Sequence, residues 1–245
     1  MMKDIFSTQA QSYARYRPGY PPALFDYLEQ ICPAKHCAWD CATGNGQIAY
    51  GLSSFFEEVR ATDISAQQLA HARQAPNIIY SKEASETSSF GDQVFDLIVV
   101  AQAIHWFDFP RFYKEVKRTL KPGGLFVVTG YSMVRVTPEI DALLLDFHEN
   151  IVGPYWDPER VYVDERYETI PFPFEELATP KLAYEDHWSL DRMLGYVDSW
   201  SATQHYIKAT GHNPVPALGQ RLASFWDPDV PVPLVFPLLL RVGRL

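Results

Sequence analysis

A glycine turn between two carboxylates is the feature of this chain that most suggests chemistry. Residues 40–46 (DCATGNG) follow a short apolar segment and precede apolar residues at helical spacing, and Asp63 ends the next apolar segment. Glycines at Gly44 and Gly46 let the backbone approach a ligand closely. A carboxylate at Asp63 can accept hydrogen bonds from both hydroxyls of a ribose. The arrangement predicts a nucleoside-binding site.

Two ligand classes use this geometry, and Asp40 separates them. In a dinucleotide fold, Gly44, Gly46 and Ala49 would hold a pyrophosphate against a helix N-terminus. A carboxylate directly before the loop would repel that pyrophosphate, whereas it would attract the ammonium of an amino acid joined to a nucleoside. We favour the second ligand and keep an NAD-dependent oxidoreductase as the alternative. Local roles also stay open, with Asp40 as an Asx-turn cap or Asp63 as a helix N-terminal charge.

Short apolar segments that alternate with helical patterns must position these groups. They lie at residues 37–40, 59–63, 77–80, 94–101 and 125–129. This alternation predicts a doubly wound parallel α/β sheet with helices on both faces. In such sheets ligands bind beyond the carboxyl ends of the strands. Those ends are Asp40, Asp63, Glu83 and the residues after Ala101.

The composition changes beyond Gly130, where aromatic, proline and acidic residues are frequent. Helices are expected at 138–151, at 190–200 and around Leu218 and Leu222, with a closing strand at 232–242. Pro237 inside that strand favours an edge or a bulge. We expect one domain over residues 1–245. Its parts are an N-terminal lid and first helix (1–34), a cofactor-binding core (35–130), a substrate-covering insertion (131–200), and a C-terminal helix with the closing strand (201–245).

The bulk composition limits the partners. Lys and Arg total 21 against 30 Asp and Glu, a net charge of −9 at pH 7, and no basic run is present. This balance disfavours nucleic acid, whose phosphates recruit basic patches. The most apolar segment, 230–240, is interrupted by prolines and is too short to span a bilayer. We therefore expect a cytoplasmic protein with no membrane partner. The oligomeric state does not follow from these features.

The cysteines suggest a metal site only weakly. Cys32, Cys37 and Cys41 cluster near His36, but no CxxC pair or second ligand pair accompanies them. We expect buried reduced thiols and no metal.

Further motifs in the core resemble the class I S-adenosylmethionine-dependent methyltransferases. Residues 95–100 (FDLIVV) are similar to the family's fourth-strand motif, and 120–124 (LKPGG) to the turn before its fifth strand. The resemblance implies S-adenosylmethionine as cofactor. It implies cofactor contacts from Asp40, Ala42, Gly44, Gly46, Asp63, Ile64, Glu83, Ala84 and Gln102. The family's loop usually begins with a third glycine, and Ala42 stands there. This departure keeps open a non-catalytic nucleoside-binding protein.

Two segments show a narrower resemblance, to the trans-aconitate methyltransferase-like subgroup. They are 13–21 (YARYRPGYP) and 101–108 (AQAIHWFD). The resemblance implies a Rossmann-like sheet of seven strands, mostly parallel with an antiparallel final strand, and a small acceptor such as a carboxylate. In our lid hypothesis, Tyr13 and its neighbouring tyrosines cover the sulfonium by cation–π attraction, and Arg17 pairs with the methionine carboxylate. The alternative is a solvated arm.

The acceptor determines which further residues are needed. An ionised carboxylate needs no base, whereas a phenol or an amine does. His105 is the candidate base, because it is the one well-placed side chain expected to titrate near neutral pH. A purely structural role for His105 stays open. Tyr20, Trp106 and Trp200 are candidate walls of the substrate pocket, although such aromatic residues also serve as core.

Overall fold

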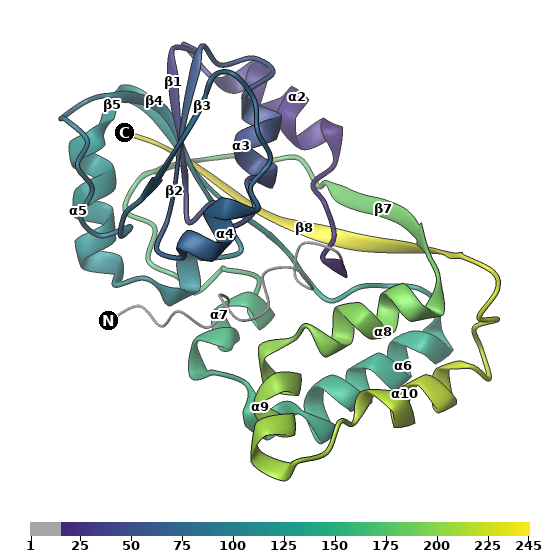
Figure 1. Cartoon of the computed structure of the whole chain (residues 1–245). Coiled ribbons are helices and arrows are strands. Elements are labelled where there is room, and N and C mark those ends of the chain that lie inside the picture. Colours follow the sequence, from purple (N-terminus) through teal and green to yellow (C-terminus); the bar gives the residue numbers. More distant parts are fainter. Residues whose placement is uncertain (1–15) are drawn as a thin grey trace.

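The computed structural model describes residues 16–245 as a mixed α/β fold (Figure 1). Its strands are β1 Cys37–Cys41, β2 Glu58–Asp63, β3 Ile78–Lys82, β4 Phe95–Ala101, β5 Leu120–Tyr131, β6 Glu175–Leu177, β7 Ala183–Trp188 and β8 Val232–Arg244. Its helices are α2 Pro22–Ile31, α3 Gln47–Leu52, α4 Ala66–Ala70, α5 Phe109–Thr119, α6 Pro138–Asp146, α7 Val161–Asp164, α8 Leu190–Asp198, α9 Ser201–Thr210 and α10 Val215–Leu222. The five strands predicted over residues 37–129 are all present.

The sheet order is β3-β2-β1-β4-β5-β8-β6, with β7 paired to β8 outside this path. Strands β1 to β5 pair in parallel, and β8 runs antiparallel to β5 as expected. The sheet has eight strands in the described chain, one more than the predicted seven. The extra strand arises because β8 is 13 residues long. Its second half pairs with β5, and its first half extends beyond the core sheet to pair with β7.

Pro237 lies where β8 changes partners. The β5 ladder ends at Leu238, and Pro237 then pairs with Ala183 of β7. The missing N–H therefore falls one residue beyond the β5 ladder, and the Pro237 carbonyl still accepts from the Ser132 amide at 3.0 Å. This placement agrees with the rule that proline is tolerated where one side of a strand is unpaired.

Apolar side chains cover both faces of the core sheet. Along β1, Trp39 packs into the cluster beneath α5, while Ala38 packs into the cluster beneath α2 and α3. Residues 95–100 of β4 are all buried, as the near-continuous apolar run predicted. Because β1 to β5 pair in parallel, their carboxyl ends lie at one edge of the sheet.

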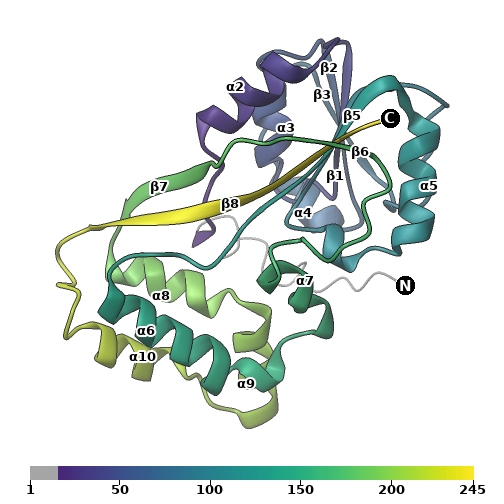
Figure 2. The same ribbon diagram turned by 180° about the vertical axis from the view of Figure 1, so that it is seen from behind.

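A second group of helices lies below the core sheet, and Figures 1 and 2 show α6, α8 and α10 side by side. Their shared core includes Trp188, Trp200 and Trp226 and the first half of β8. The predicted helix over 138–151 continues past α6 as a π-helical turn, Phe147–Ile151. Helix α9 was not predicted. The group also includes α9 and α10, whose buried side chains pack into the same core.

No helix within residues 16–245 is long and apolar enough to cross a membrane. The three cysteines are buried and reduced. Across that same range, no three His, Cys, Asp or Glu side chains gather in a way that would hold a metal ion.

Candidate active site

The glycine turn connects β1 to α3 through three residues with left-handed backbone. Ala42, Gly44 and Gly46 have φ of 56°, 56° and 75°. Glycine adopts this conformation freely, whereas alanine pays for the clash of its Cβ. At Gly46 a side chain is disfavoured by the left-handed backbone and also by lack of space, because a Cβ there would lie 2.3 Å from the Tyr80 hydroxyl. The Thr43 amide donates to the Thr62 carbonyl at 2.9 Å, which ties the turn to β2.

Asp40 lies beneath this turn as a buried carboxylate. Its Oδ2 accepts from the Ala49 amide at 2.8 Å and from the Thr43 hydroxyl. Its Oδ1 is buried and has no hydrogen-bond partner in the described chain. Burial, with the nearby negative charge of Asp63 adding to it, raises the Asp40 pKa to about 7. A buried oxygen without a partner is costly, and a cationic donor would satisfy it.

Asp63 joins the turn to the end of β2. Its Oδ2 accepts from the Gly44 amide at 2.9 Å, and its Oδ1 accepts from the Ser65 amide at 2.8 Å. A carboxylate can accept several hydrogen bonds at once, so Asp63 suits a ligand that presents hydroxyl groups. Ser65, not Asp63, caps α4 by accepting from Gln68. Ile64 is half-buried beside Asp63.

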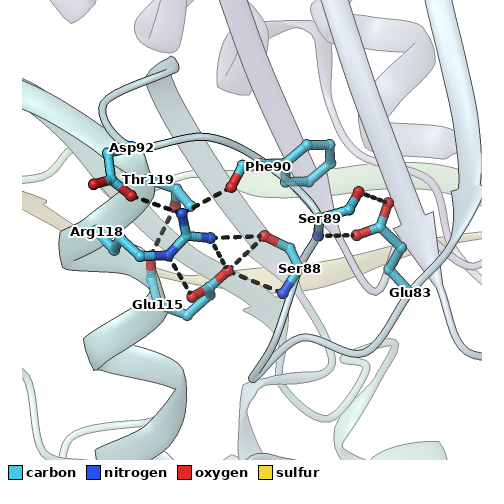
Figure 3. Close-up of polar contacts among 8 residues, drawn as sticks. All are labelled: Glu83, Ser88, Ser89, Phe90, Asp92, Glu115, Arg118 and Thr119. Atoms are coloured by element: carbon cyan, nitrogen blue, oxygen red, sulfur yellow. Dashed lines mark hydrogen bonds and ion pairs between the residues drawn. The ribbon is translucent and has the colours of Figure 1, made fainter.

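Glu83 closes the loop that follows β3 (Figure 3). Its carboxylate accepts from the Ser89 amide at 2.7 Å and from the Ser89 hydroxyl at 2.9 Å. Farther along the loop, the Ser88 amide donates to Glu115 of α5 at 2.9 Å, and Arg118 pairs with the same carboxylate. The loop is thus fixed at both ends. Ala84 is exposed within it, and the Glu83 amide donates to the Asp63 carbonyl at 3.2 Å.

A cavity at the carboxyl end of β4 brings together residues that are far apart in sequence. Its walls are Arg17, Gln102, His105, Trp106, Trp156, Asp157, Arg160, Val163, Trp200 and Ser201. Five of these are sequence-predicted site residues. The others come from the 156–163 segment, and from Ser201 at the start of α9.

The N-terminal candidates have different positions. Tyr13 lies outside the described residues. Arg17 donates to the Ser199 carbonyl at 2.9 Å and lies 5.4 Å over the Tyr196 ring, which links the N-terminal segment to the second helical group. Tyr20 does not line the cavity and packs in the α2–α3 cluster, so its predicted place in the pocket wall is not observed. Trp200 is both core and wall, because it also contacts Trp156 and Tyr196.

His105 is only 8% exposed. Its Nδ1 lies 3.2 Å from the Tyr167 hydroxyl, and its ring lies between Trp106 and Tyr167. Burial and the nearby Arg160 charge lower its pKa to about 3. The expectation that His105 titrates near neutral pH is therefore wrong: the imidazole is neutral there. The sequence motif around His105 does not reveal that its imidazole is buried in the folded protein.

Nothing in the sequence singled out Tyr167 or Arg160 as residues of the site. Arg160 lies 4.6 Å over the Trp156 ring and pairs with Asp164 at 2.9 Å. Both belong to a stretch of short turns between α6 and β6. No periodicity marks such a stretch, so no signal in the sequence identified which side chains reach the cavity.

Comparisons with known proteins connect this geometry to a family. A sequence model described as "Methyltransferase domain" matches residues 39–128. A Dictyostelium discoideum protein named as a methyltransferase is 32% identical over 89% of this chain and 85% of its own length. A solved structure from Anaeromyxobacter dehalogenans, named as a type II methyltransferase, is 38% identical and covers 94% of this chain and 98% of its own, with a TM-score of 0.87.

The chain belongs to the class I S-adenosylmethionine-dependent methyltransferases. The matched region begins in β1 and contains the glycine turn, Asp63, Glu83 and His105. This membership decides against the NAD-dependent oxidoreductase that the glycine turn alone left open.

Ala42 places a strained, left-handed alanine in the glycine turn of this methyltransferase. We predict that Ala42→Gly stabilises the protein by about 0.5–1 kcal/mol. Relief of the left-handed alanine (about 1–2 kcal/mol) exceeds the added entropy of the unfolded chain (about 0.4–1 kcal/mol). Urea unfolding measures the difference. Ala70→Gly, at the end of α4, serves as a control and should destabilise. A destabilised Ala42→Gly protein would contradict the strain assigned to this position.

Proposed function

We propose that this methyltransferase binds S-adenosylmethionine at the glycine turn and methylates an oxygen nucleophile of a small molecule, a carboxylate or a hydroxyl. The observation that carries the proposal is the Asp40 carboxylate, buried and with one unpartnered oxygen directly beneath the turn. That oxygen suits the ammonium of the cofactor's methionine part. The bound cofactor supplies a methyl group on a sulfonium, which is a good leaving group.

The residues at the strand ends fit the rest of that cofactor. Gly44 and Gly46 let the backbone of the turn approach a ligand closely, and the Asp63 carboxylate at the end of β2 suits the hydroxyls of a ribose. Ile64 and the loop at Glu83 and Ala84 flank the place expected for the adenine. Gln102 and Arg17 line the cavity beyond, toward the methionine end.

The cavity walls support a small acceptor. Trp106, Trp156 and Trp200 surround a space that a polymer would not enter without moving them. Arg160 supplies a positive charge that favours an acceptor with an anionic group. In this proposal the segment 156–163 and the start of α9 form a helical cap over the site. The protein contributes positioning and exclusion of water rather than strong acid–base chemistry. The trans-aconitate-like motifs favour the same acceptor class.

A second candidate function rests on Ala42. A protein that binds the nucleoside without catalysis is favoured by a strained alanine where the family usually has glycine. This alternative predicts weak cofactor binding that Ala42→Gly restores.

Calorimetric titration of the purified protein with S-adenosylhomocysteine, with NADH in parallel, tests the proposal. We expect micromolar binding of S-adenosylhomocysteine alone. Binding of NADH alone would overturn the role given to Asp40. Binding of neither would favour a degenerate scaffold, and the Ala42→Gly protein then shows whether the alanine is the cause.

A further inference from the structure

A chain of hydrogen bonds runs from the backbone of β5 to the imidazole in the cavity wall. The Gln102 side-chain amide donates to the Tyr131 carbonyl at 3.3 Å. The Tyr167 hydroxyl donates to Gln102 Oε1 at 3.2 Å and lies 3.2 Å from His105 Nδ1. The chain thus links the end of β5, the turn after β4 and the segment after α7.

The polarity of these three contacts follows from which groups can donate and which can only accept. A carbonyl only accepts, so the Gln102 nitrogen faces Tyr131 and its oxygen faces Tyr167. The amide oxygen also only accepts, so the single hydroxyl proton of Tyr167 is directed to it. His105 Nδ1 must then be the donor to the Tyr167 oxygen. The neutral ring therefore carries its proton on Nδ1 and a lone pair on Nε2.

Two residues of this hydrogen-bonded network have a strained backbone, which indicates that the surrounding structure holds them in place. Gln102 and Tyr167 have φ of 53° and 61°, although neither is glycine. Such left-handed conformations are unfavourable for residues with a Cβ, and they persist where the surroundings fix them. Gly130 makes the room, because a Cβ there would lie 2.3 Å from Gln102 Oε1 and 3.1 Å from the Tyr167 ring. Tyr167 is fully buried.

With Nδ1 bound to Tyr167, Nε2 is the nitrogen left for the cavity that His105 lines. We propose that Tyr167 is a positioning residue that presents the Nε2 lone pair to the acceptor, and that this selects an acceptor with a proton on its reacting atom, a hydroxyl rather than an ionised carboxylate. The lone pair of His105 Nε2 can accept a hydrogen bond from a hydroxyl group, whereas it repels the oxygen of an ionised carboxylate. The low pKa of His105 keeps the ring from becoming a cation that would attract the carboxylate. The inference rests on the proposed function and narrows it.

In the methyl transfer, His105 acts as the base that takes the hydroxyl proton. The hydroxyl oxygen forms a bond to the methyl carbon as the carbon–sulfur bond breaks, and the bonding pair stays on sulfur. The hydroxyl proton moves to His105 Nε2, which leaves a methyl ether and an imidazolium that later loses its proton to water. A weak base is sufficient, because an oxygen gaining a methyl group becomes far more acidic than imidazolium.

Nitrogen-15 NMR of the histidine rings at pH 7 tests the tautomer without turnover. We expect His105 to carry its proton on Nδ1, and Tyr167→Phe to abolish that preference while thermal unfolding stays cooperative. Tyr162→Phe, a matched change in the same segment, should leave the His105 signals unchanged. A proton on Nε2, or a cationic ring, in the unmodified protein would overturn the proposal. An unchanged tautomer in Tyr167→Phe would overturn the role of Tyr167.

Phenol and benzoate serve as probes of the acceptor class in the complex with S-adenosylhomocysteine. We expect saturating phenol to shift the Nε2 resonance of His105 and benzoate to leave it in place. A shift with benzoate alone, or with neither probe, would overturn the selection of a protonated acceptor. Calorimetry with S-adenosylhomocysteine on the same sample separates the two proposals. Failure to bind it refutes the proposed function whatever the His105 tautomer, whereas normal binding with the wrong tautomer refutes only this inference.

Discussion

Asp40→Asn should weaken binding of S-adenosylhomocysteine by about 10- to 100-fold without destabilising the fold. An asparagine oxygen can still accept from the Ala49 amide and the Thr43 hydroxyl, as Asp40 Oδ2 does. The substitution removes a charge-assisted hydrogen bond to the ligand's ammonium, about 1.5–3 kcal/mol. Calorimetry measures the affinity and thermal unfolding at pH 8 measures stability. Unchanged affinity would show that Asp40 serves only as a cap for the turn.

The pH dependence gives the same prediction a second signature. Since the Asp40 pKa is about 7 in the free protein, a cationic ligand that favours the carboxylate displaces a proton at and below that pH. Affinity should rise by up to about tenfold per pH unit below 7 and level off above it. Stability runs the other way. Because the Asp40 pKa is higher in the folded protein than in the unfolded chain, protonation of Asp40 stabilises the fold. This stabilisation is fully present below the pKa of the unfolded chain, near 3.8, and is lost as the pH rises through 7. Asp40→Asn should remove both trends.

Asp63→Ala should weaken cofactor binding by more than about 100-fold and loosen the turn. The change removes the acceptors of the Gly44 and Ser65 amides as well as the proposed ribose contacts. Several hydrogen bonds of about 1–3 kcal/mol each are lost together. Calorimetry with S-adenosylhomocysteine and with adenosine measures the effect, and both ligands should weaken in parallel because both carry the ribose.

Asp229→Ala is the matched control for Asp63→Ala, because Asp229 is an exposed carboxylate in the segment before β8. It should bind the cofactor like the unmodified protein. A selective loss of S-adenosylhomocysteine with adenosine binding retained would place Asp63 near the methionine part and contradict the ribose assignment.

The core of the fold could be predicted because its signals are local. Each strand of the parallel core is a short apolar run, and burial on both faces makes that run nearly continuous, as at Phe95–Ala101. The turn could be predicted because Gly44 and Gly46 are required by backbone geometry. Strand β7 could not, since its residues alternate weakly and become a strand only because β8 extends far enough to pair with them.

The acceptor side of the site was less accessible to sequence reasoning for a related reason. The 156–167 segment has no regular hydrophobic period. Tertiary contacts alone place Arg160 in the wall of the cavity and bring the Tyr167 hydroxyl to Gln102, which also lines it. The ionisation of His105 depends on burial that the motif around it does not encode. Residue types near β4 therefore led to an expectation about the charge of His105 that the structure does not support.

Strand β8 has a consequence for the order in which the protein is made. It pairs with the edge of β5 that faces away from β4, yet about 100 residues separate the end of β5 from the start of β8. As the chain leaves the ribosome, the β5 edge stays unpaired while the intervening helices emerge. An exposed apolar edge of that kind is a site of aggregation. We expect nascent chains arrested before residue 232 to depend on chaperones, and expression yield to be sensitive to changes in Val232–Arg244 that leave the active site untouched.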